Sequence, residues 1–163
     1  MRKLVFTALA VALLAACGTV NSGTGLTKAE RMEAKRRSIA QAIDNRHYTI
    51  DMRTAFPLRH PQILLTYGYS LEVAGDTVKS YLPYYGRAYS IPYGGGRGLN
   101  FTGIISGYHD YGTRQGTRRI ELQTTTDEDT YVFKMDISDT GGVTLDVFSK
   151  EREQIGFYGE ISE

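Results

Sequence analysis

The chain has 163 residues, of which 41% are hydrophobic and 23% charged, with a formal net charge of +1. This balance lacks the basic excess of nucleic-acid-binding domains, so nucleic acid is not an expected partner. Cys17 is the single cysteine, which excludes a disulfide within the chain and a metal site built from several thiolates.

Residues 1–16 have the pattern of a cleaved secretory signal. Arg2 and Lys3 give a positively charged start, and an apolar run follows as far as Ala16. This run is shorter than the roughly 20 apolar residues that a membrane-spanning helix needs. It ends in Leu-Ala-Ala-Cys at Cys17, which resembles the lipobox of bacterial lipoproteins. That resemblance implies a diacylglycerol on the Cys17 thiol and cleavage of the chain before it.

Residues 17–25 are rich in Gly, Ser and Thr, which predicts a flexible tether between the lipid and the domain. Position 18 is Gly and not Asp, which by analogy with lipoprotein sorting favours the outer membrane over the inner one. The tether also lacks the acidic cluster that resembles surface-export tags. We therefore expect a lipid-anchored protein at the periplasmic face of the outer membrane.

A single domain is expected over residues 26–163, and it begins with a helix. Thr27 and Glu30 fit a capping box, and the residues that follow, as far as about Arg46, are mostly good helix formers. Three apolar residues fall on one thin stripe of this helix: Met32, Ile39 and Ile43.

From His47 onward, apolar and polar residues alternate, which predicts β-strands with one buried face. Gly75-Asp76 predicts a tight hairpin, and further turns are expected at residues 112–116, 126–129 and 139–142. The expected strands cover Tyr48–Met52, Ile63–Val73, Thr77–Tyr81, Leu99–Ile105, Ile120–Thr124, Tyr131–Ile137, Val143–Val147 and Ile155–Ile161.

Short links between about eight strands predict antiparallel neighbours in a mainly β domain. Such a meander buries its apolar face either by closing into a lipocalin-like barrel or by folding into a two-layer sandwich. Both architectures fit the pattern, with the helix preceding the strands.

Several segments carry a family resemblance. They are LEVAGDTV at 71–78, SYLPYYGRAY at 80–89, PYGGG at 92–96, GLNF at 98–101 and IGFYGE at 155–160. Together with the lipobox, they resemble the Bacteroidota lipoproteins grouped as domain of unknown function 4251. The resemblance implies an envelope lipoprotein with one β-rich domain, and it supplies no activity and no catalytic residues.

Residues 80–101 form the Tyr/Gly/Arg segment, an unusually long connection. Prolines and a glycine run exclude a regular strand throughout, and long ordered loops are often functional. Tyrosine rings suit contact with a glycan or peptide, and arginines suit a carboxylate or phosphate. The candidate ligand-binding residues are Tyr81, Tyr84, Tyr85, Arg87, Tyr89, Tyr93 and Arg97. Alternatively, these tyrosines fold back and close one end of the barrel.

No catalytic or metal-binding motif is present in the sequence. The three histidines, at positions 47, 60 and 109, share no metal-ligand spacing, and the acidic turn at Asp127–Asp129 is expected to be solvated. We therefore expect no enzyme activity, metal or cofactor. The expected function is a binding or accessory lipoprotein that uses the Tyr/Gly/Arg segment or the barrel mouth. The alternative is a structural partner of another envelope protein, which predicts an exposed apolar patch or an unpaired edge strand.

Overall fold

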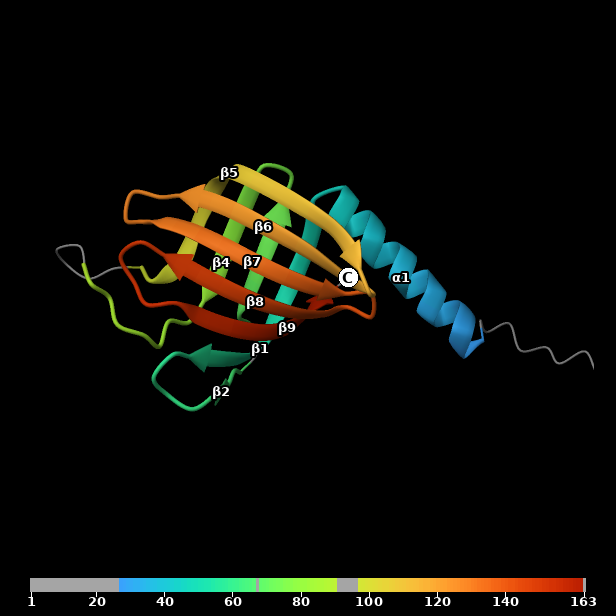
Figure 1. Ribbon diagram of the computed structural model, residues 1–163, viewed down its shortest axis with the longest axis horizontal. Coiled ribbons are helices and arrows are strands. Elements are labelled where there is room, and N and C mark those ends of the chain that lie inside the picture. The colour runs from blue at the N-terminus through green and yellow to red at the C-terminus, as the bar shows by residue number, and fades with distance from the viewer. Residues whose placement is uncertain (1–26, 67, 91–96, 163) are drawn as a thin grey trace, which may run out of the picture.

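The computed structural model describes residues 27–66, 68–90 and 97–162. In this part of the chain, one helix is followed by nine strands (Figure 1). They are α1 (Lys28–Asp44), β1 (His47–Pro57), β2 (Ile63–Leu64), β3 (Ser70–Ala74), β4 (Thr77–Leu82), β5 (Leu99–Arg114), β6 (Thr117–Thr125), β7 (Thr130–Ser138), β8 (Gly142–Ser149) and β9 (Ile155–Ser162). The predicted signal, the tether and Cys17 lie outside the described residues. In the described part of the chain, no helix is long and apolar enough to cross a membrane.

Helix α1 begins with the predicted capping box. The Glu30 amide donates to the Thr27 hydroxyl (3.2 Å), and the Thr27 amide donates to the Glu30 carboxylate (2.7 Å). These bonds satisfy amides that a helix N-terminus leaves without partners in the helix. Ile39 and Ile43 are buried against the barrel, but Met32 is 43% exposed. The predicted stripe packs only at its C-terminal end, because the first half of α1 extends past the barrel (Figure 1).

The strands form one antiparallel sheet that closes on itself. Its order is β2-β1-β3-β4-β5-β6-β7-β8-β9, and β1 also pairs with β9. Eight strands therefore make a closed barrel, while β2 lies beside β1 as a short additional strand. Most strands pair with the next one in the chain because the links are too short for a crossover. The predicted meander is confirmed as a barrel, and the sandwich alternative is excluded.

The barrel interior is a packed core. Successive side chains of a strand point to opposite faces, so the alternating residues of the sequence become the inner layer. Tyr131, Phe133 and Phe157 are its largest fully buried side chains. Other members are Ile50, Leu71, Val78, Leu82, Ile120, Leu122, Met135, Leu145 and Ile155. This packing leaves the two ends and the outer wall of the barrel as places for a ligand.

The continuous strand predicted from Ile63 to Val73 is wrong, because the structure divides it. β2 ends at Leu64 and β3 begins at Ser70, with Gly68 between them at a φ of 106°. Glycine adopts this left-handed conformation without a steric penalty, and it interrupts the extended backbone. The first half of β1 consequently pairs with β3, and its second half pairs with β2.

Strand β5 is longer than predicted and reaches Arg114. Only the last two residues of the predicted turn at 112–116 form it, Gln115 (φ 52°) and Gly116 (φ 78°). Two successive left-handed residues are the arrangement that tight hairpins favour, since it matches the twist of the strands.

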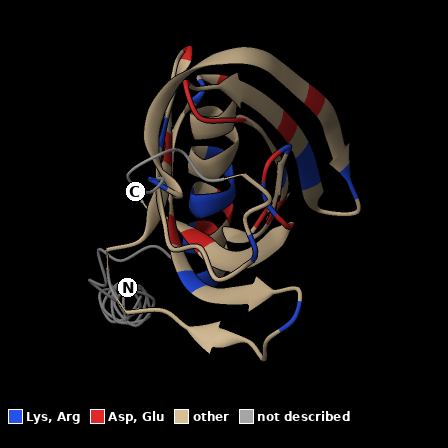
Figure 2. Cartoon of the chain, turned by 90° about the vertical axis from the view of Figure 1, so that its left-hand side faces the viewer, with Lys and Arg blue, Asp and Glu red and all other residues tan. Residues whose placement is uncertain are grey.

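Helix α1 covers one end of the barrel, opposite the end from which Figure 2 is viewed. Arg118 on β6 attaches it there. Its guanidinium lies 2.6 Å from Asp44, in the last turn of α1, and also contacts Asp110 on β5. Beside them, the Arg46 guanidinium lies over the Tyr108 ring, 4.4 Å from its centroid. The opposite end of the barrel carries the described residues that follow β4, together with the β6–β7 and β8–β9 connections (Figure 1).

Candidate functional site

The Tyr/Gly/Arg segment is attached to the connection between β8 and β9. Ala88 forms an antiparallel bridge with Arg152. On either side of this bridge, the Tyr89 amide donates to the Glu151 carbonyl (2.7 Å), and the Glu153 amide donates to the Arg87 carbonyl (2.9 Å). The backbone of residues 87–89 is thereby fixed against the loop end of the barrel.

The Glu153 carboxylate joins this segment to the loop between β1 and β2. It accepts a hydrogen bond from Arg59 Nε (2.8 Å) and one from the Arg87 amide (3.3 Å). Its side chain is only 5% exposed, so a partner must compensate the buried charge. Hydrogen bonding from Arg59 is the main reason that the pKa of Glu153 lies below its usual value.

A groove of about 720 Å³ lies between these elements. Residues 59–62 of the β1–β2 loop and Ile63 of β2 form one wall, residues 85–87 form the other, and Glu153 lies between them. The Arg59 side chain is 56% exposed beside Glu153. Arg87 is also exposed, and its guanidinium makes no hydrogen bond or ion pair with any described residue. Two arginines from distant parts of the chain thus reach one hollow.

Tyr85 and Arg87 are the predicted site residues that line this groove. Tyr84 packs beneath it, with its hydroxyl within hydrogen-bond distance of the Arg87 carbonyl (2.8 Å) and the Glu153 carbonyl (3.0 Å). Burial raises the pKa of Tyr84. Gly86 makes this packing feasible, since a β-carbon there would lie 2.5 Å from the Tyr84 hydroxyl. Residues 85–87 of the segment therefore form a wall of the groove, whereas Tyr84 helps to close the end of the barrel.

The remaining predicted residues lie elsewhere. Tyr81 is on the outer wall, where its ring stacks on Tyr69 with centroids 5.6 Å apart. Tyr89 is 69% exposed outside the groove lining, and Tyr93 lies outside the described residues. Arg97 binds the acidic turn: it contacts Asp127, and its Nε lies 3.0 Å from Glu128.

The prediction of a solvated acidic turn at Asp127–Asp129 is wrong at its last two residues, because the Glu128 side chain is only 12% exposed and Asp129 is buried. The Asp129 side chain is completely buried and accepts hydrogen bonds from the Thr130 amide (2.7 Å) and the Lys150 amide (3.1 Å). Arg152, 4% exposed, lies 3.5 Å from Asp129 and 3.4 Å from Glu128. Buried charges need such pairing, and these pairs hold the two turns of the loop end together.

Sequence reasoning overlooked several groove residues. Arg59, His60 and Glu153 were not among the residues predicted from the sequence to form a site. The only local signal was the cluster of charge at residues 150–153. Among the described residues, no group of three or more His, Cys, Asp or Glu side chains is arranged to hold a metal ion.

The comparisons with known proteins concern the family and the fold. The model of the domain of unknown function 4251 (DUF4251) matches residues 30–161. The fold resembles the crystal structure of a DUF4251 family protein from Bacteroides eggerthii DSM 20697, with a TM-score of 0.57 and 10% identity. This alignment covers 78% of this chain and 87% of that one. No curated protein matches the sequence. Since the family model spans most of the chain, the protein belongs to the DUF4251 family.

Proposed function

We propose that this protein is a lipid-anchored envelope protein that binds a carboxylate-bearing ligand, an acidic peptide or glycan, in the groove. The observation that carries this proposal is the convergence of Arg59 and Arg87 on one hollow with a single buried carboxylate, Glu153, between them. The two guanidinium groups outnumber the carboxylate, so the groove is left with net positive charge. Arginine binds carboxylates through paired hydrogen bonds, which suits an anionic ligand.

A binding role is favoured over a catalytic one, because the carboxylate of the groove is already hydrogen-bonded within the protein. Glu153 is the carboxylate of the groove, and it is already engaged by Arg59 and by the Arg87 amide. A general base needs a carboxylate free to take a proton from its substrate. The groups that remain open to a ligand, such as the Arg87 guanidinium, hold and orient anions.

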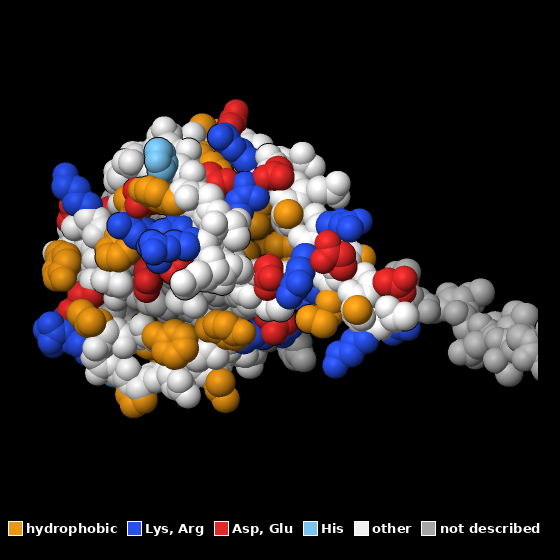
Figure 3. Space-filling view, turned by 45° about the vertical axis from the view of Figure 1, so that its right-hand side comes forward, with side chains coloured by type: hydrophobic (Ala, Val, Ile, Leu, Met, Phe, Trp, Pro, Cys, Tyr) orange, Lys and Arg blue, Asp and Glu red, His pale blue; other side chains and the backbone are white. Residues whose placement is uncertain are grey.

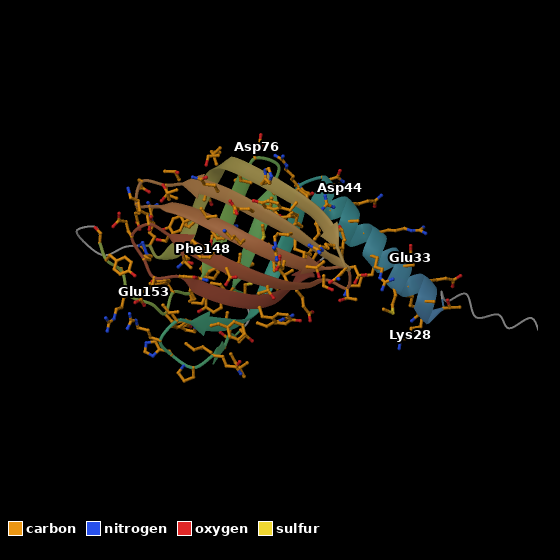
Figure 4. All side chains as sticks on the ribbon, viewed as in Figure 1. Lys28, Glu33, Asp44, Asp76, Phe148 and Glu153 are labelled. Carbon is orange, nitrogen blue, oxygen red and sulfur yellow. The ribbon has the colours of Figure 1, made fainter. Side chains whose placement is uncertain are left out.

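The position of the groove suits a ligand away from the membrane surface. The proposed anchor, Cys17 at the periplasmic face of the outer membrane, precedes Lys28, where α1 begins. Lys28 and Glu153 lie at opposite ends of the molecule (Figure 4). The groove would then open towards the periplasm, which favours a peptide or glycan there over a lipid headgroup.

Substitution of Arg87 by Gln tests the groove. The full-length protein in detergent micelles would be titrated with short acidic peptides and oligogalacturonides, followed by backbone amide NMR. A hydrogen bond to a charged group contributes about 1.5–3 kcal/mol, so we expect Arg87→Gln to weaken binding roughly 10- to 100-fold. The backbone bonds of residue 87 remain in this variant, so the segment stays in place.

Leu64→Ser is the matched control, because Leu64 is exposed on the neighbouring hairpin but does not line the groove. It should leave the affinity unchanged. Equal affinity of wild type and Arg87→Gln for every acidic probe would contradict the proposal. Loss of binding in Leu64→Ser alone would instead show that the ligand contacts the exposed apolar side chains of the β1–β2 hairpin.

A second role, docking of another envelope protein, is favoured by that apolar face. Leu64 is 79% exposed, Leu58 is 68% exposed and Phe56 is 43% exposed, all on the hairpin of β1 and β2. Figure 3 shows hydrophobic side chains gathering along the lower side of the molecule, where this hairpin lies. β2 is also the terminal strand of the sheet. Exposed apolar side chains beside a sheet edge are typical of protein-binding surfaces.

A further inference from the structure

We propose that the ligand of the groove is the C-terminal end of a peptide, held by its free carboxylate. This inference rests on the proposed function and narrows its ligand class. It follows from the charge of the groove, from the chemistry of its walls and from its size.

The charge of the groove matches a monoanion. Arg59 and Arg87 each carry one positive charge and Glu153 carries one negative charge, so these three side chains together leave a single positive charge. A peptide carboxylate neutralises this charge. A phosphomonoester carries about −1.5 to −2, so it would leave excess negative charge beside the buried Glu153 carboxylate. The negative charges of the phosphate and of Glu153 would repel each other, and this repulsion is stronger in a buried site than in water.

The walls next to the arginines are largely apolar. Pro61 and Ile63 lie on the hairpin side, and the Tyr85 ring lies on the other. These groups suit the hydrocarbon side chain of a terminal residue, and the Gln62 amide can pair with a peptide group. A sugar acid carries a hydroxyl on most ring carbons, and these walls would leave several of them without partners, at a cost for each. The walls therefore favour a peptide over a uronic acid.

The size of the groove is consistent with a peptide end. Its volume of about 720 Å³ falls within the roughly 300–1,000 Å³ of small-ligand sites. Of the two arginines, Arg59 is engaged by Glu153 through Nε, whereas no described residue pairs with the Arg87 guanidinium, which can therefore bind the carboxylate of the ligand.

Three blocked peptides of similar size separate the alternatives, each titrated into the full-length protein in micelles. They are acetyl-Ala-Ala-Leu with a free carboxylate, the same peptide as its C-terminal amide, and acetyl-Ala-Glu-Leu amide. The first and third both carry one negative charge, but only the first carries it at the chain end. We expect the free-acid peptide to bind at least about 10-fold more tightly than either amide, and Arg87→Gln to remove the difference.

Each outcome decides the inference. Preference for the free terminus that Arg87→Gln removes supports it. Equal binding of the two anionic peptides overturns it, while the proposed carboxylate site stands. Failure of all three peptides overturns it as well, and the proposed function is then judged by its own panel of acidic peptides and oligogalacturonides. Preference that persists in Arg87→Gln also overturns it, because the carboxylate then binds elsewhere.

Discussion

Glu153 is the residue on which the two walls of the groove depend. It contacts Arg59 from the β1–β2 loop and the Arg87 amide from the Tyr/Gly/Arg segment, while its own backbone pairs with the segment. Its lowered pKa shows that the folded protein favours the ionised form. A group with a lowered folded pKa stabilises the fold above its unfolded pKa, here 4.5, and loses this contribution as the pH falls through the folded value.

Glu153→Gln should therefore destabilise the protein near pH 7 and make its stability less sensitive to acid below about pH 4.5. Urea unfolding of wild type and variant at about pH 7 and about pH 3 measures both effects, and the two midpoints should converge at the acid end. Glu33→Gln is the control, because Glu33 belongs to an exposed ion pair on α1 and should shift stability by less than about 0.5 kcal/mol. A constant difference between wild type and Glu153→Gln at both pH values would contradict this role for the carboxylate.

Among the elements, β1 and β9 decide whether the sheet closes. They pair from Thr49 to Pro57, and Gly159 lies in β9 beside Asp51 and Met52. A β-carbon at position 159 would lie 2.3 Å from the Asp51 carbonyl oxygen, closer than atoms can pack. Glycine is therefore required for the close approach of the two strands that completes the barrel.

Gly159→Ala should cost about 1–3 kcal/mol of unfolding free energy, because β1 and β9 must move apart or distort. Gly107→Ala is the matched control in β5, where the nearest atom would be 3.6 Å away, an ordinary contact distance. Because alanine reduces the entropy of the unfolded chain, the control should be neutral or slightly stabilising. Urea denaturation of both variants measures their free energies of unfolding. Equal values would show that the pairing of β1 with β9 accommodates a side chain at position 159.

At the scale of the whole molecule, the helix and the groove occupy opposite ends of the barrel (Figures 1 and 4). The first half of α1 contributes little to the core, since Met32 remains exposed. This half projects away from the barrel, and its first residue, Lys28, follows the proposed anchor at Cys17 in the sequence. The arrangement suits a protein held at one end and open to its ligand at the other.

Cys17→Ser tests the anchor. The wild-type protein should be recovered with the membrane fraction and show the mass of an acylated chain that begins at Cys17. The variant should lack the acyl mass and leave that fraction, because without the Cys17 thiol no acyl chain supplies membrane affinity. Ser22→Ala, in the same tether, should behave as the wild type. A wild-type chain with an unmodified Cys17 would rule out lipid attachment there.

Local patterns determined much of this protein without a structure. The capping box, the Gly75-Asp76 hairpin and the inward-facing positions of the strands depend on residues next to each other in the chain. Each is settled by backbone geometry, by hydrogen bonding of adjacent groups or by the two-residue period of a strand. The same information predicted an antiparallel meander and the family resemblance, and it selected Tyr85 and Arg87 as candidates.

Closure and the groove were decided only in three dimensions. Barrel and sandwich share one alternating pattern, and what separates them is the pairing of β1 with β9, the first strand with the last. Likewise, Arg59, Arg87 and Glu153 are far apart in the chain, and no local pattern relates them. They meet because the loops of a closed barrel gather at its end, where the energy of burying Glu153 depends on partners that only the tertiary structure supplies.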